Sequence, residues 1–432
     1  MKLQPALLLL CLSVLLPLNL RVAAAPAAPA VAPAPAYTPP PAQAVPAAVP
    51  PRTTAQTATP PSAAPSAPPT AAVPAAPQAV PSPPVVDAKG YLLIDFNTGA
   101  VLAESRADDR LEPASLTKIM TGYTIYRELL AGHVRLTDPV LISENAWRTG
   151  GSKMFIEVGK QVPLEDLLKG MIIQSGNDAS VALAEHVAGS EQVFAELMNT
   201  NAQRLGMTNS HFVNVTGLPD PNHFTTARDI ARVTAALIRE FPKFYEWDGT
   251  KEYEYNGIKQ QNRNRLLWRD ATVDGVKTGY TEAAGYCLVA SARRDGMRLV
   301  SVVLGAKNPE ARAVASLELL NYGFRFFESH LLYPADQPLE NLRVWKGDLK
   351  ELPVGPGRDV YATIPRGRYA ELSPRLDKAQ TLTAPIARGA RVGDIVVFLA
   401  GTEVSRVPLV ALQDVAEGNL WQRTRDTVWQ WF

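Results

Sequence analysis

Residues 26–84 set the first limit on the fold, because they consist almost entirely of Ala, Pro, Val, Ser and Thr and hold more than half of the chain's 37 prolines. Such a segment has too few large apolar side chains to offset the conformational entropy that folding removes, and its prolines favour extended polyproline conformations. We therefore expect 26–84 to be a disordered, semi-stiff tether, with any packed core formed by later residues. A low-complexity insertion without a spacing role is the alternative.

The opening stretch, MKLQPALLLLCLSVLLPLNLRVAAA, has the layout of a secretory signal peptide. Lys2 precedes an apolar run that is too short and too interrupted by proline for a comfortable membrane span, and small residues follow it. We expect residues 1–25 to direct export, with cleavage near Ala24 or Ala25 and the choice of bond left open. An uncleaved N-terminal anchor is the alternative.

Composition narrows the class of protein further. The 432 residues are 46% hydrophobic and 20% charged, which suits one large or two moderate globular domains with packed cores. The net charge of +1 argues against nucleic acid as the main partner. The two cysteines are Cys11 and Cys287, and the first would leave with the signal peptide. The exported chain would therefore have no internal disulfide.

Globular patterning begins at Val85 and predicts an α+β domain over residues 85–329. Two strands around the turn NTG are predicted within 90–109, and two more joined by an Asp-Gly turn within 284–306. Because helical patterns lie between them, we expect the N- and C-terminal strands to meet in one sheet. The helical patterns cover 115–132, 164–176, 178–189, 191–206 and 227–241.

The texture changes after this domain. Residues 330–415 hold short alternating stretches separated by Gly and Pro, which predict a small all-β domain. Residues 416–432 end the chain with a predicted amphipathic helix that is too short to span a bilayer but suits the headgroup region. A helix docked on the β domain is the alternative. The apolar half of the predicted helix holds Leu420, Trp421, Val428, Trp429, Trp431 and Phe432, and its polar half holds Arg423, Asp426, Thr427 and Gln430.

The sequence PASLTKIMTG places Ser115 and Lys118 three positions apart at the start of a helical pattern. Residues at this spacing share a helix face, so the two side chains would project together as a nucleophile beside a possible base. A lysine acts as a base only when burial and nearby positive charge lower its pKa. The alternative is a helix-capping serine and a solvated lysine.

Two later motifs supply what such a pair needs. In MIIQSGNDAS, Ser175, Gly176 and Asn177 lie between two helical patterns, on a loop that can project short polar side chains into a cleft. In DGVKTGYTEAAGY, Lys277 begins a Lys-Thr-Gly run at the start of the hairpin, where the missing side chain of Gly279 would let a substrate lie close to the strand. Each triplet alone is weak, but chance rarely produces the ordered set of three.

This ordered set resembles that of penicillin-binding proteins and class A β-lactamases. Gly176 at the second place of the middle motif favours the low-molecular-mass penicillin-binding proteins of the D-alanyl-D-alanine carboxypeptidase kind. The resemblance covers nearly everything after the tether, including QQNRNRLLW and NYGFRFFE. It implies a penicillin-binding, β-lactamase-like domain in which a sheet carries a helical cluster, followed by the small β domain and the C-terminal helix.

The resemblance also implies roles for the motif residues. Ser115 would attack the carbonyl of the penultimate D-alanine while Lys118 accepts its proton. Ser175 would relay a proton to the leaving group, supported by the ammonium of Lys277, which would also help to keep Lys118 neutral. Asn177 would orient Lys118 and the substrate amide.

Four further residues are implied in substrate binding. Thr278 and Arg312 would hold the terminal carboxylate, next to Gly279, and the backbone N–H groups of Ser115 and Tyr280 would form the oxyanion hole. An exposed structural arginine is the alternative for Arg312. Tyr280 stands where the family often has His, which puts any imidazole role there in doubt. Arg263, which also matches the family, is expected to be structural.

The predicted function is that of a serine-type D-Ala-D-Ala carboxypeptidase that trims peptidoglycan stem peptides and is acylated by penicillin. It would be periplasmic, attached to the outer face of the cytoplasmic membrane, and would need no cofactor or metal. Alternatives are a D,D-endopeptidase, a β-lactamase, or a non-catalytic cell-wall scaffold. The stem-peptide preference, the oligomeric state and the role of the β domain stay open.

Overall fold

The computed structural model describes residues 79–429. The expected signal peptide, 1–25, and most of the expected tether, 26–84, lie outside the described residues, as do the last three residues of the chain. Residues 79–84 contact the domain that follows. Val80 packs against the core beside the last helix of that domain, and Tyr322 Oη donates a hydrogen bond of 3.0 Å to the carbonyl of Pro81.

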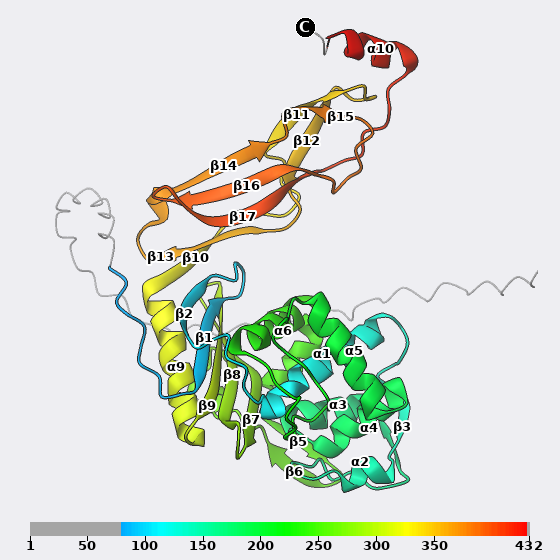
Figure 1. Ribbon diagram of the computed structural model, residues 1–432, viewed down its shortest axis with the longest axis vertical. Coiled ribbons are helices and arrows are strands. Elements are labelled where there is room, and N and C mark those ends of the chain that lie inside the picture. Colours follow the sequence, from blue (N-terminus) through cyan, green and yellow to red (C-terminus); the bar gives the residue numbers. More distant parts are fainter. Residues whose placement is uncertain (1–78, 430–432) are drawn as a thin grey trace, which may run out of the picture. The chain divides into compact units, whose positions relative to one another are not determined.

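A five-stranded antiparallel sheet forms the centre of the first domain (Figure 1). The first two strands pair with the last three in the order β2-β1-β9-β8-β7, so the predicted meeting of N- and C-terminal strands is confirmed. The strand β7, which carries the Lys-Thr-Gly run, lies at one edge of this sheet. The bounds are β1 (Gly90–Asp95), β2 (Val101–Ser105), β7 (Val273–Thr281), β8 (Gly285–Arg294) and β9 (Met297–Ala306).

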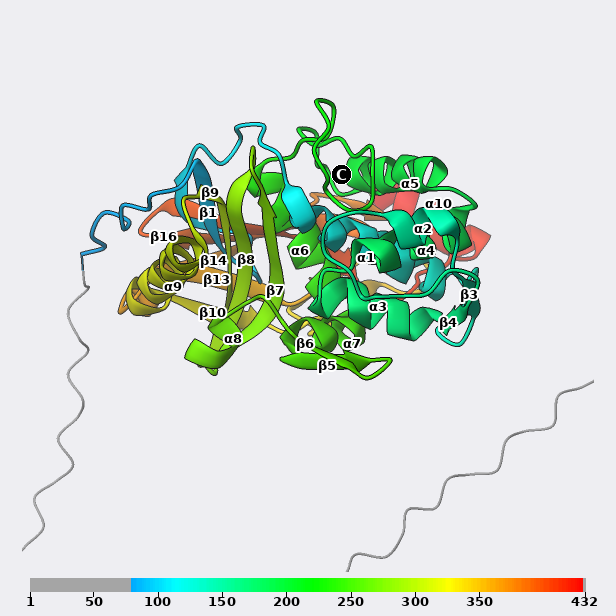
Figure 2. The same cartoon turned by 90° about the horizontal axis from the view of Figure 1, so that it is seen from below.

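Both faces of the sheet are buried. In β9, Val300 and Val302 belong to the core shared with the helical cluster, whereas Leu299 and Val303 belong to the core shared with α9 (Pro309–Phe326). Figure 2 shows α9 on one side of the sheet and the helical cluster, which lies between residues 117 and 240, on the opposite side. This burial explains why β9 reads as a nearly continuous apolar run and not as an alternating one.

The helical cluster follows the predicted ranges closely. Ser190 and Thr226 cap two of its helices by accepting backbone N–H groups, and Gly189 ends another in a left-handed conformation at φ 78°. These features were readable from the sequence, and the predicted α+β class is confirmed. The bounds are α1 (Thr117–Leu130), α3 (Leu164–Ile173), α4 (Asn177–Ala188), α5 (Glu191–Arg204) and α6 (Ala227–Glu240).

The turn between β8 and β9 confirms the Asp-Gly signal. Asp295 and Gly296 have φ values of 48° and 82°, as expected of a two-residue turn in which both central residues are left-handed. Shorter elements escaped the sequence analysis because three to five residues are too few to show a period. They are α2 (Glu144–Arg148), α7 (Pro242–Tyr245), α8 (Leu266–Arg269), β3 (Pro139–Leu141), β4 (Gln161–Pro163), β5 (Glu252–Tyr255) and β6 (Ile258–Gln261).

After α9 the chain forms mostly strands, as its alternating pattern predicted. Leu352, Val354, Ile395 and Leu409 are fully buried in the core of this β-rich part. A six-stranded sheet has the order β14-β16-β17-β12-β11-β15, and β10 pairs with β13. The bounds are β10 (Phe327–Tyr333), β11 (Glu340–Trp345), β12 (Glu351–Pro356), β13 (Val360–Pro365), β14 (Leu372–Lys378), β15 (Leu382–Thr383), β16 (Arg391–Leu399) and β17 (Thr402–Ala411).

The C-terminal segment forms α10 (Leu420–Trp429), the predicted helix. The carboxylate of Asp426 is buried and accepts the backbone N–H of Lys346 at 2.8 Å, so the polar side of α10 contacts the β-rich part. Leu420 and Trp421, from the predicted apolar side, are 82% and 77% exposed. None of the helices described between residues 79 and 429 has the length and apolar character needed to cross a membrane.

Candidate active site

Ser115 lies in a single 3-10 turn, Ala114–Leu116, immediately before α1. Lys118 lies in the first turn of α1, and its Nζ is 3.2 Å from the Oγ of Ser115. The side chains therefore meet as the spacing predicted.

The amine of Lys118 is almost completely enclosed, with 3% of the residue exposed. It donates hydrogen bonds to the Oδ1 of Asn177 at 2.7 Å and to the carbonyl of Thr216 at 2.8 Å. Burial first, and then the charges of Lys277 and Arg263, hold the pKa of Lys118 well below its usual value. A neutral amine has two N–H groups and one lone pair. Because the two acceptors occupy both N–H groups, the lone pair is left to face Ser115.

A second buried lysine supports the serine of the middle motif. The Nζ of Lys277 donates to the Oγ of Ser175 at 2.9 Å and to the carbonyl of Thr278 at 3.1 Å. Burial is the main cause that lowers the pKa of Lys277 to about 7, and the charge of Arg263 adds to it. Near neutral pH this amine can therefore both hold and release a proton.

The N-terminus of α4 fixes a loop at the mouth of the site. Asn177 donates through its side chain to the carbonyl of Gly150 and through its backbone to the carbonyl of Ser152, both at 2.7 Å. The buried carboxylate of Asp178 accepts the backbone N–H groups of Met154 and Phe155, at 2.8 and 2.9 Å. The sequence analysis missed Asp178, although an acidic residue in the first turn of a helix was a readable signal.

The space left by the missing side chain of Gly279 is taken by another part of the chain, not only by substrate as the sequence suggested. A Cβ at this position would lie 3.1 Å from the backbone nitrogen of Ser115 and 3.1 Å from the carbonyl of Pro113. The expectation that this space admits substrate is therefore incomplete. The missing side chain first lets the turn that carries Ser115 lie against β7.

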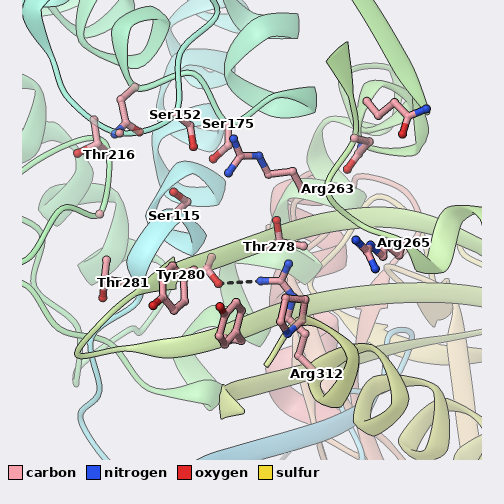
Figure 3. A pocket seen from close by; sticks show the side chains of 18 of the residues that line it. Ser115, Ser152, Ser175, Thr216, Arg263, Arg265, Thr278, Tyr280, Thr281 and Arg312 are labelled. Atoms are coloured by element: carbon pink, nitrogen blue, oxygen red, sulfur yellow. Dashed lines mark hydrogen bonds between the residues drawn. The ribbon is translucent and has the colours of Figure 1, made fainter. Parts of the chain in front are cut away.

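One cavity of about 1070 Å³ connects the predicted site residues (Figure 3). The two lysines contact its lining through Ser115 and Ser175. Lining residues from the predictions are Ser115, Ser175, Asn177, Thr278, Gly279, Tyr280 and Arg312, and residues that the sequence analysis missed include Ser152, Thr216, Tyr286 and Trp268.

Tyr280 and Arg312 occupy one wall of this cavity. Tyr280 is 52% exposed and its ring stacks on that of Tyr286, with centroids 4.2 Å apart. Arg312 is buried and donates through Nη1 to the carbonyls of Gly279 at 2.9 Å and Cys287 at 3.2 Å. The alternative of an exposed arginine on a helix surface is therefore wrong. Burial lowers the pKa of Arg312 to about 10, which leaves it charged at neutral pH.

Between residues 79 and 429, no three His, Cys, Asp or Glu side chains are grouped closely enough to hold a metal ion. The site can perform acyl transfer on a substrate that has a carboxylate. It holds a serine hydroxyl beside a neutral amine, a second serine beside a second amine, and an arginine at the wall.

Comparison with known proteins agrees with this chemistry. Residues 77–308 match the family described as D-alanyl-D-alanine carboxypeptidase, and residues 327–417 match the penicillin-binding protein 5 C-terminal domain. The chain is 47% identical over 362 residues to the D-alanyl-D-alanine carboxypeptidase DacC of Escherichia coli (strain K12), covering 81% of this chain and 90% of that protein. Its identity to DacA of the same strain is 43% over 357 residues, covering 81% and 89%.

A solved structure extends the likeness to three dimensions. Penicillin-binding protein 5 from Haemophilus influenzae superposes with a TM-score of 0.73 at 42% sequence identity. The match covers 78% of this chain and 99% of that one, so it includes both the site and the β-rich part.

Replacing Asp178 by Ala tests the hydrogen bonds that hold the loop at the mouth of the site. We expect the free energy of unfolding to fall by about 1–3 kcal/mol for each N–H group left unsatisfied. Hydrogen–deuterium exchange should accelerate at Met154 and Phe155. The exposed Asp109→Ala is the control and should change stability by less than about 0.5 kcal/mol. Unchanged exchange at the two amides would contradict this account of the loop.

Proposed function

The chain belongs to the D-alanyl-D-alanine carboxypeptidase family, and we propose that Ser115 is the nucleophile with which it removes the terminal D-alanine of peptidoglycan stem peptides. The observation that carries this assignment is the 3.2 Å approach of the Lys118 amine to the Ser115 hydroxyl. An amine whose two N–H groups are already engaged has only its lone pair to offer to that hydroxyl.

Acylation starts with proton transfer from Ser115 to the neutral Lys118. The Oγ of Ser115 then attacks the carbonyl carbon of the penultimate D-alanine. Charge that develops on the carbonyl oxygen is received by the backbone N–H groups of Ser115 and Tyr280. Asn177 keeps the lysine in place through the hydrogen bond of 2.7 Å to its side-chain oxygen.

The departing D-alanine needs a proton on its amine. Ser175 relays that proton, and Lys277 stabilises the relay because its amine lies 2.9 Å from the Ser175 hydroxyl. Water then hydrolyses the ester on Ser115, which releases the shortened stem peptide. The charge of Lys277 is also one of the two positive charges that lower the pKa of Lys118, so its removal would raise that pKa.

Thr278 and Arg312 hold the carboxylate of the terminal residue in this proposal. Arg312 is buried in the wall of the cavity and remains charged, and only one of its terminal nitrogens is used by the backbone carbonyls. Its other N–H groups are available for a carboxylate, which a guanidinium matches in geometry. A peptide without a free C-terminal carboxylate would lack this contact, which is consistent with a carboxypeptidase.

The assignment of Ser115 is tested with a fluorescent penicillin, which acylates the same oxygen as the peptide. Covalent labelling should be complete in the wild-type protein and absent in Ser115→Ala, and release of D-alanine from diacetyl-Lys-D-Ala-D-Ala should be lost with it. The control Ser373→Ala removes an exposed hydroxyl in β14 and should keep both activities. Labelling that persists in Ser115→Ala would reject the assignment, and rapid turnover of penicillin would identify a β-lactamase.

The proposal extends to the organisation of the whole chain. Residues 1–25 would direct export to the periplasm, 26–84 would form the tether, 85–329 the peptidase domain and 330–415 the β domain. Residues 416–432 would attach the protein to the outer face of the cytoplasmic membrane.

The exposure of Leu420 and Trp421 supports membrane attachment. Because Asp426 is turned toward the β-rich part, these two apolar side chains are presented outward. Aromatic and aliphatic side chains on one side of a short helix suit the headgroup region of a bilayer.

Deletion of residues 419–432 tests this attachment. The truncated protein should move from the membrane pellet to the soluble fraction, because it loses the apolar side of α10 and keeps the cavity around Ser115. D-alanine release from a soluble peptide should persist. A full-length Trp421→Ser variant should show partial release, whereas Thr427→Ser, on the polar side, should stay with the membrane. Retention of the truncated form in the pellet would assign the anchor to another segment.

A further inference from the structure

The charged side chains that line the cavity are all basic. Four arginines line it, and no aspartate or glutamate does. A D-alanine leaving group carries a single carboxylate, so this lining holds more positive charge than that group can neutralise. The four are Arg263, Arg265, Arg269 and Arg312.

Two of these arginines are already engaged by the protein. Arg269 donates two hydrogen bonds to the carboxylate of Glu310, at 2.7 and 2.6 Å. Arg312 donates to the carbonyl of Gly279 and is the proposed partner of the terminal carboxylate.

Arg263 and Arg265 are both exposed, and neither forms an ion pair with any residue between 79 and 429. They differ in position, because the charge of Arg263 lowers the pKa of Lys118 and of Lys277, whereas Arg265 is not among the causes of either shift.

Arg265 lies toward one end of the cavity. In Figure 3, Arg265 lies beyond Thr278, whereas Tyr280 and Thr281 lie on the other side of Thr278. Arg265 immediately precedes α8, and the bond between Arg269 and Glu310 ties α8 to the first turn of α9. This end of the cavity therefore has a wall fixed by an ion pair, and the guanidinium of Arg265 lies on it. The hydrogen bond from Arg269 is the main cause that lowers the pKa of Glu310, and Arg265 lies close enough to add to it but is not paired with that carboxyl.

The arginines repel one another while no anion is bound. Burial is the main cause that lowers the pKa of Arg312 to about 10, and the charges of Arg263 and Arg265 add to it. One carboxylate beside Arg312 would relieve only part of this repulsion. A second anionic group on the same ligand would relieve more. Of the two arginines without an ion pair within residues 79–429, Arg263 acts on the buried lysines, which leaves Arg265 for this second group.

We infer that Arg265 is a specificity residue that binds a second carboxylate on the leaving group. The assignment depends on the proposed function, in which Thr278 and Arg312 hold the carboxylate next to the scissile bond. A leaving-group side chain longer than methyl then continues toward Arg265. The fitting substrates are peptides whose terminal residue has an additional acid group, either as a free acidic D-amino acid or as the carboxylate-bearing part of a peptide cross-link.

The reaction is the same hydrolysis with a larger leaving group. The Oγ of Ser115 forms an ester with the D-alanine carbonyl carbon as the C–N bond breaks, and the amine departs with the proton that Ser175 relays. Water hydrolyses the ester. In the net reaction, one peptide and one water give a shortened peptide and a released amine that carries the additional carboxylate. No oxidant or other co-reactant is needed.

Three peptides separate charge from size in the test. Each begins with diacetyl-Lys-D-Ala and ends in D-Ala, D-Glu or D-Gln, so the last two match in shape and differ in one charge. With the full-length protein, kcat/KM should be about tenfold higher for D-Glu than for D-Gln. The ratio should shrink as salt is added, because Arg265 is exposed and its charge is screened.

Matched arginine variants identify the residue responsible. Arg265→Gln should bring the D-Glu to D-Gln ratio close to one, and Arg265→Lys should keep most of the preference. The double variant Arg269→Gln/Glu310→Gln removes a neighbouring ion pair without changing the net charge, so its ratio should stay near the wild-type value. A wild-type ratio near one, or an unchanged ratio in Arg265→Gln, would overturn the inference. Failure to hydrolyse the D-Ala peptide would instead contradict the proposed function.

A cross-linked dimer of stem peptides distinguishes the two sources of the acid group. Cleavage of the dimer that weakens in Arg265→Gln would identify the cross-link as the natural leaving group. A preference for D-Glu without cleavage of the dimer would identify a free acidic residue. Either result supports a site for a second carboxylate at Arg265.

Discussion

The rest of the site depends on the enclosure of one amine, that of Lys118. A lysine in water has a pKa of about 10.4 and is a poor base at neutral pH because it is already protonated. Here the fold removes water from the amine and supplies two oxygen acceptors, from Asn177 and Thr216, for its two N–H groups. Burial therefore determines the charge of the amine, and the two acceptors leave its lone pair for Ser115.

Segments that are far apart in the sequence form this enclosure together. The serine and the lysine come from one turn and the helix that follows it, the acceptor Asn177 comes from the N-terminus of α4, and Lys277 comes from the edge strand of the sheet. Sheet and helical cluster must both be packed before these groups meet. Gly279 allows the Ser115 turn to lie against β7, because a side chain there would press on the backbone of that turn.

Much of this could be predicted from the sequence where the signal was local. The Ser-x-x-Lys spacing on a helix, the Asp-Gly hairpin and the capped helices all depend on neighbours in the chain. The rest depends on contacts between distant segments. The carbonyl of Thr216 that holds Lys118 and the loop held by Asp178 carry no motif of their own, and no local signal indicated that Gly279 lies against the Ser115 turn. The sequence also could not rank the causes of the lowered lysine pKa. It named burial and nearby positive charge together; in the structure burial comes first, and Lys277, with its own pKa of about 7, comes second.

The pH dependence of the rate at which penicillin acylates Ser115 tests the central claim most directly. Acylation needs neutral Lys118, so the rate should rise with pH and level off well below the usual range of lysine, about 10.4. Arg263→Gln removes one of the charges that lower the pKa of Lys118, and it should move this rise to higher pH. A rate that keeps rising through the ordinary lysine range, with no change in Arg263→Gln, would contradict the account.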